Sequence, residues 1–105
     1  MENKYGISEK SYGLILEALQ NIPELDKAVI FGSRAMGNYK SGSDIDIAVY
    51  GKELTFSLVT QLHGKLNERL PIPYYIDIVL VDILKNQELL AHICQEGKVL
   101  FKKSN

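Results

Sequence analysis

Apolar residues recur along the chain with helical and strand periods, and the changes of period outline the expected elements. Residues 8–22 carry apolar side chains at three- and four-residue spacing, which predicts a helix with one buried stripe. The same spacing returns at 54–70, where Pro71 ends it, and at 86–97, where Gly97 is placed as the stop. The sequence therefore predicts three longer helices.

Shorter segments between these helices have the patterns of strands. Residues 27–31 are continuously apolar, and residues 44–50 alternate, with isoleucines on one face and two aspartates on the other. Residues 74–81 are rich in β-branched and aromatic side chains, and residues 98–101 predict a short last strand. The order predicts a single α/β domain over residues 1–105, in which helices pack against a small sheet.

Composition narrows the class of protein. The chain has 105 residues, of which 46% are hydrophobic, as expected for one globular domain. A net charge of −1 argues against broad binding to nucleic acid or to an anionic membrane. A single cysteine excludes an internal disulfide and a cysteine-based zinc site. With no apolar run of spanning length and no apolar signal core at the start, we expect a cytoplasmic protein.

Asp44 and Asp46 are the first candidates for chemistry. Residues two apart on a strand lie roughly 6.6 Å apart and point the same way, so the two carboxylates are parallel and repel each other. Two Mg²⁺ ions about 3.5–4 Å apart, shared with substrate phosphates, are the arrangement that uses such a pair. The alternative is structural: Asp44 ends a Ser-Gly-Ser turn, and Asp46 lies on a solvated sheet face.

Asp77 interrupts the apolar run of residues 74–81. It lies between Ile76 and Ile78, where an unpaired buried charge would be expensive. If this strand neighbours the strand that carries Asp46, the carboxylates gather at one place. The alternative is that Asp77 lies on an exposed face or pairs with a surface lysine.

Gly32 and Ser33 follow the strand at 27–31 and precede a short helix. Such a turn exposes backbone N–H groups and a hydroxyl to an anion, and glycine lets the backbone approach a phosphate closely. An ordinary strand-to-helix turn is the alternative. A P-loop is excluded, because Asn38 and Tyr39 stand where Lys and Ser or Thr are required.

The spacing of these residues resembles a known signature. Gly32-Ser33, ten intervening residues and then Asp44-x-Asp46 match the motif of the DNA polymerase β-like nucleotidyltransferase superfamily. The stretch "GSRA…SDIDIAV" looks most like the minimal nucleotidyltransferases, the antitoxin half of bacterial HEPN/MNT toxin–antitoxin pairs. The resemblance covers essentially the whole chain and implies the α+β fold of that superfamily, a small mixed sheet packed with helices.

The resemblance also implies roles for individual residues. Gly32 and Ser33 would hold the β- and γ-phosphates of ATP, and Asp77 would be the candidate base that accepts the proton of the attacking hydroxyl. Arg34 would be the one nearby cation that binds the triphosphate, because Met36 stands where many members repeat an arginine. Two Mg²⁺ ions would be bound by the three carboxylates Asp44, Asp46 and Asp77.

The activity implied by the resemblance is transfer of AMP from ATP to a protein hydroxyl, a tyrosine of a HEPN-domain ribonuclease toxin. Two alternatives are a subunit that neutralises the toxin by contact alone and a small-molecule nucleotidyltransferase of the aminoglycoside-modifying type. The first alternative would leave the Gly-Ser pair and all three carboxylates unexplained. The second is disfavoured because those enzymes carry an additional substrate-binding domain.

The remaining polar residues have ordinary expected roles. His63 and His92 lie on predicted helices, far in sequence from the aspartates, and are expected to be packing or surface residues. Cys94 is expected to be a small core side chain.

Overall fold

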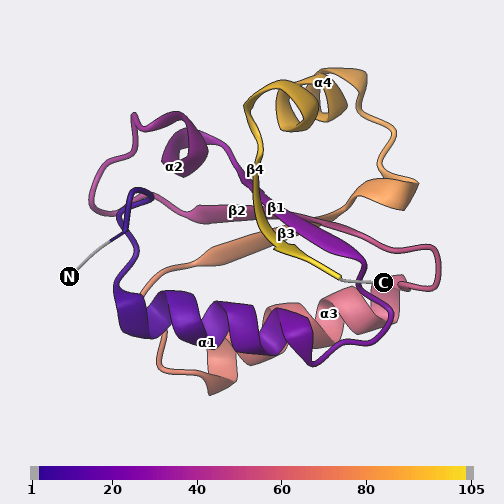
Figure 1. Ribbon diagram of the computed structural model, residues 1–105, viewed down its shortest axis with the longest axis horizontal. Coiled ribbons are helices and arrows are strands. Elements are labelled where there is room, and N and C mark those ends of the chain that lie inside the picture. The colour runs from indigo at the N-terminus through magenta and orange to yellow at the C-terminus, as the bar shows by residue number, and fades with distance from the viewer. Residues whose placement is uncertain (1–2, 104–105) are drawn as a thin grey trace.

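The computed structural model describes residues 3–103, which form a four-stranded sheet with helices on both faces (Figure 1). The sheet is mixed: β2 and β3 are parallel, and the other neighbouring pairs are antiparallel. Its order is β3-β2-β1-β4, so β3 and β4 are the edges. The four strands are β1 (Lys27–Phe31), β2 (Ile45–Tyr50), β3 (Ile76–Leu80) and β4 (Lys98–Lys102). This is the α+β architecture that the resemblance implies.

The helices occupy the expected segments. They are α1 (Glu9–Gln20), α2 (Ser33–Met36), α3 (Phe56–Gly64) and α4 (Gln87–Glu96). The three longer helices each begin at a side-chain N-cap, from Ser8, Thr55 and Asn86 respectively. A π-helical turn, η1 (Lys65–Arg69), extends α3, and a 3₁₀ turn, η2 (Val81–Ile83), follows β3. Within residues 3–103, no helix is both long enough and apolar enough to cross a bilayer.

The main core lies between one face of the sheet and the helices α1 and α3. Figure 1 shows these two helices side by side below the strands. In β2 the side chains of Ile45, Ile47 and Val49 point into this core and are fully buried. They meet Leu19 of α1 and Leu62 of α3. The predicted alternation of β2 is therefore confirmed.

The opposite face of the sheet is only partly covered. Ile93 of α4 packs there against Val29, Phe31 and Ala48, which form a second, smaller cluster. Asp46 precedes Ala48 by two residues on β2 and therefore projects from the same face. This face is divided into an apolar part beneath α4 and an acidic part beside it.

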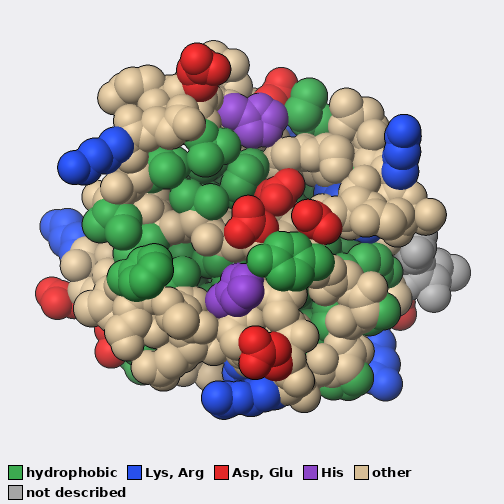
Figure 2. Space-filling view, turned by 180° about the vertical axis from the view of Figure 1, so that it is seen from behind, with side chains coloured by type: hydrophobic (Ala, Val, Ile, Leu, Met, Phe, Trp, Pro, Cys, Tyr) green, Lys and Arg blue, Asp and Glu red, His purple; other side chains and the backbone are tan. Residues whose placement is uncertain are grey.

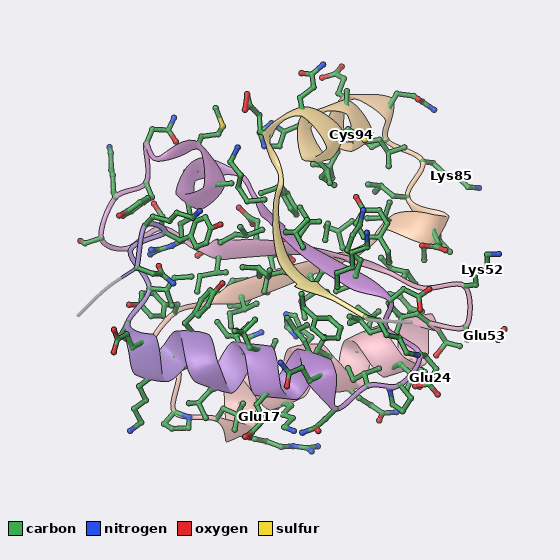
Figure 3. All side chains as sticks on the ribbon, in the orientation of Figure 1. Glu17, Glu24, Lys52, Glu53, Lys85 and Cys94 are labelled. Carbon is green, nitrogen blue, oxygen red and sulfur yellow. The ribbon has the colours of Figure 1, made fainter. Side chains whose placement is uncertain are left out.

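The alternative of an exposed Asp77 is confirmed, and the expectation for Cys94 was wrong. Asp77 is exposed, because β3 is an edge strand, so its charge remains in contact with water. Cys94 is also exposed, because α4 packs on the sheet through Ile93 and the following residue projects away (Figure 3). The apolar residues on either side of Asp77 point to the buried face of β3, so they say nothing about the burial of the carboxylate on the other face.

Candidate active site

Parallel pairing of β2 and β3 brings the acidic side chains together. Asp46 lies directly opposite Asp77, on strands that are about 4.8 Å apart. Asp44 comes immediately before β2, and its charge also acts on Asp46. Figure 2 shows this acidic group at the centre of one face, between the two histidines of the chain. The strands that carry Asp46 and Asp77 are therefore adjacent in the sheet, as the gathering of the carboxylates required.

The carboxyl of Asp46 has an unusual protonation equilibrium. Its half-buried position raises its pKa above the ordinary value, and the charges of Asp77 and then Asp44 raise the pKa further. The imidazole of His92 acts in the opposite direction and lowers this pKa. The site therefore holds more negative charge than the protein around it offsets, which favours the binding of cations.

Gly32 lies against Asp46 because of the strand register. Phe31 is directly opposite Asp46, so the next residue passes beside the carboxylate. A Cβ atom on Gly32 would collide with Oδ2 of Asp46, and the backbone has φ of +75° and ψ of −156°, a region almost confined to glycine. The N–H of Gly32 donates to Nε2 of His92 at 3.2 Å. Glycine is required here by both its conformation and its neighbour.

Substitution of Gly32 by Ala is expected to destabilise the fold by about 1–3 kcal/mol and to weaken ATP binding, because backbone strain is joined by displacement of Asp46. Urea denaturation measures the first effect and calorimetry with ATP the second. Gly37→Ala is the matched control: its φ is +86°, but a Cβ there meets open space. It should lose stability and keep its ATP affinity. Equal ATP affinity in both variants would show that the collision with Asp46 has no effect on the site.

Arg34 occupies a different environment from the expected phosphate contact. Its side chain is 1% exposed, and the guanidinium lies between the rings of Tyr39 and Tyr74, at 5.0 and 4.9 Å from their centroids. It donates to the carbonyl oxygens of Tyr5, Gly6 and Ser43 at 2.8–3.1 Å. Since these bonds use Nε and both terminal nitrogens, we interpret Arg34 as a structural residue that ties the loop before Asp44 to the N-terminal segment.

Two residues near the site were not predicted from the sequence. His92 lies at the acidic group, with its ring 6.0 Å from that of Phe31, because α4 folds back over the sheet. Asn67 of η1 bonds both backbone groups of Ile76, the residue before Asp77. The position of His92 could have been predicted from the apolar face of α4. That helix had to cover the face of the sheet that carries Asp46, and this brings His92 near the carboxylate. The sequence holds no comparable signal for Asn67.

The donor set fits divalent cations that are shared with a nucleotide. Within residues 3–103, no three histidine, cysteine or acidic side chains form a complete metal cage. Mg²⁺ is commonly bound by one or two carboxylates together with waters and substrate phosphates, and not by such a cage. The raised pKa of Asp46 fits this mode, because a cation would relieve the repulsion among the carboxylates.

The fold and the site define a nucleotidyltransferase. The family described as "Polymerase beta, Nucleotidyltransferase" matches residues 14–105, and the chain belongs to it. Among curated proteins it is similar to "Protein adenylyltransferase MntA" of Aphanizomenon flos-aquae (strain 2012/KM1/D3), with 34% identity over 113 aligned positions. The alignment covers 98% of this chain and 74% of that relative.

Solved structures of toxin–antitoxin complexes contain chains with the same fold. The chain resembles one in a crystal structure of a toxin–antitoxin with AMP-PNP, with a TM-score of 0.72 and 30% identity, covering 88% of this chain and 73% of the other. It also resembles one in the structure of a tri-AMPylated Shewanella oneidensis HEPN toxin in complex with MNT antitoxin. There the TM-score is 0.67 at 27% identity, with 90% and 72% of the two chains covered. The expected superfamily is thus confirmed by sequence and by structure.

Proposed function

We propose that this chain is a Mg²⁺-dependent adenylyltransferase that transfers AMP from ATP to a tyrosine hydroxyl of a HEPN-domain toxin, and that it acts as the antitoxin of that toxin. The observation that carries the proposal is the placement of Asp46 directly opposite Asp77 and against Gly32. The relative named as a protein adenylyltransferase and the similar antitoxin bound to an AMPylated HEPN toxin support the nature of the acceptor.

Each residue of the site has a defined task in this reaction. Gly32 and Ser33 hold the phosphates, because glycine lets the backbone approach an anion closely. Asp77 accepts the proton of the attacking hydroxyl, and its exposed position on the edge strand leaves it open to an acceptor. The hydroxyl oxygen forms a bond to the α-phosphorus as the bond from that phosphorus to pyrophosphate breaks.

The carboxylates of Asp44, Asp46 and Asp77 would hold the metal. Two Mg²⁺ ions, when bound, would neutralise the phosphate charge and polarise the α-phosphate. The strand register holds the carboxylate of Asp46 beside the Gly32 turn, so a metal ion bound by Asp46 would lie next to the phosphates. Asp44 is exposed and immediately precedes β2.

The proposal is tested with the intact chain, the HEPN-domain toxin of the same genome, ATP and Mg²⁺, followed by mass spectrometry of the toxin. We expect an increase of about 329 Da for each AMP transferred. A parallel reaction with α,β-methylene-ATP is the control, because its bridging carbon prevents loss of pyrophosphate. Silencing of the toxin without a mass increase, or equally with the analogue, would show neutralisation by binding.

A further inference from the structure

The outer edge of β3 presents backbone groups beside Asp77. In a parallel pair, alternate residues direct both backbone groups toward the neighbouring strand. The N–H of Ile45 donates to the carbonyl of Tyr75 at 2.9 Å, so Tyr75 and Asp77 face β2. Ile76 and Ile78 therefore direct their N–H and C=O groups outward, away from the sheet.

A side-chain amide already occupies the first of these outward positions. Nδ2 of Asn67 donates to the carbonyl of Ile76 at 2.9 Å, and Oδ1 accepts from the N–H of Ile76 at 2.9 Å. These are the two bonds that one residue of an added antiparallel strand would make. The next outward position, Ile78, meets no hydrogen-bonding partner within residues 3–103. At the outer edge of β3, the backbone groups of Ile76 are therefore hydrogen-bonded, and those of Ile78 are available to a partner.

An apolar groove runs beside this open position. Two adjoining cavities of about 440 and 240 Å³ share the residues Phe56, Val59 and Ile78. Phe56 is 70% exposed and Ile83, which lines the larger cavity, is 59% exposed. Figure 2 shows hydrophobic side chains gathered beside the acidic group. An exposed apolar surface with unpaired strand groups is the combination used for binding an extended segment.

We propose that an extended segment of the acceptor protein adds to the edge of β3 at Ile78, an inference that rests on the proposed function. Side chains of an extended segment alternate between the two faces of a sheet. One side chain therefore enters the groove at Phe56, on the core face, while its neighbour reaches the opposite face, where Asp77 lies. The acceptor tyrosine is accordingly flanked directly by an apolar residue that occupies the groove.

Hydrogen exchange of the complex tests the backbone part of this inference. The amide of Ile78 should exchange rapidly in the free chain and at least tenfold more slowly with the HEPN-domain toxin bound. Unchanged exchange at Ile78 in a complex whose toxin is AMPylated would overturn the docking site and leave the proposed function standing. Protection of Ile78 without AMP transfer would support the docking site and reject the transfer.

Steady-state kinetics tests the groove. Phe56→Ala should raise KM for the toxin about tenfold, as for a central interface aromatic, with kcat and ATP affinity unchanged. Val99→Ala is the matched control, because Val99 is 57% exposed on β4, the opposite edge of the sheet. It should leave KM unchanged. Equal values of KM in wild type and Phe56→Ala would exclude the groove from acceptor binding.

Discussion

Substitution of Asp46 by Asn is expected to reduce AMP transfer roughly 10³-fold or more, because it removes the central carboxylate and leaves its shape nearly unchanged. The rate is measured as AMP incorporated into the toxin at saturating ATP and Mg²⁺. Asp26→Asn is the matched control, since the exposed Asp26 precedes the other end of β1, five residues from Phe31. A full rate in the Asp46 variant would show that this carboxylate is structural.

The same substitution should make the metal-free protein more stable at neutral pH. The folded chain holds the proton of Asp46 more tightly than the unfolded chain does, because burial and Asp77 raise its pKa. The free energy of unfolding consequently falls as the pH rises through this raised pKa, and asparagine avoids that loss.

Thermal unfolding measures this difference. We expect the variant to melt a few degrees above wild type in metal-free buffer, where about 1 kcal/mol corresponds to roughly 4–8 °C. The difference should disappear below pH 3.8, the ordinary pKa of an aspartate, and should narrow when Mg²⁺ is added to wild type. A wild type that is more stable at neutral pH without metal would contradict the repulsion inferred here.

Substitution of Arg34 by Met is expected to destabilise the fold by about 3 kcal/mol or more. The change leaves the carbonyl groups of Tyr5, Gly6 and Ser43 without their donor, and each buried polar group that loses its partner costs about 1–3 kcal/mol. Since small domains are stable by about 5–15 kcal/mol in total, this loss is large. Urea denaturation at constant m-value measures it.

Arg69→Met is the control for the loss of a positive charge, because Arg69 is exposed on η1. It should change stability by less than about 0.5 kcal/mol. If Arg34→Met retained its stability and instead lost ATP affinity, Arg34 would be a phosphate ligand and not a structural residue.

Much of the fold could be predicted from local pattern. The alternation in β2 decides which side chains enter the main core, so it also placed Asp46 on the opposite face. The turn at Gly32 and Ser33 was also predictable, because Gly-Ser follows a buried strand there, and its role as a phosphate-binding turn stays a prediction. In each case the residues of one short segment are enough to predict the local structure.

The rest depends on segments that are distant in sequence. Whether Asp77 was buried could not be read from its apolar neighbours, because the exposure of its side chain follows from the place of β3 at the sheet edge. Arg34 resembled a phosphate ligand because of its position after Ser33, but its partners include the backbone of Tyr5, 29 residues away. The approach of His92 to Gly32 spans 60 residues and depends on how α4 folds back.

The buried guanidinium has a consequence for how the molecule opens. It joins the backbone of Tyr5 and Gly6 to that of Ser43, and Tyr74, which stacks on it, also receives the N–H of Ser8. Three stretches that are far apart in sequence are therefore held by one side chain and should undergo local unfolding as one cooperative unit. Fraying of the N-terminal segment would then loosen the loop that leads to Asp44, so the position of this carboxylate is coupled to the anchoring of Tyr5 and Gly6.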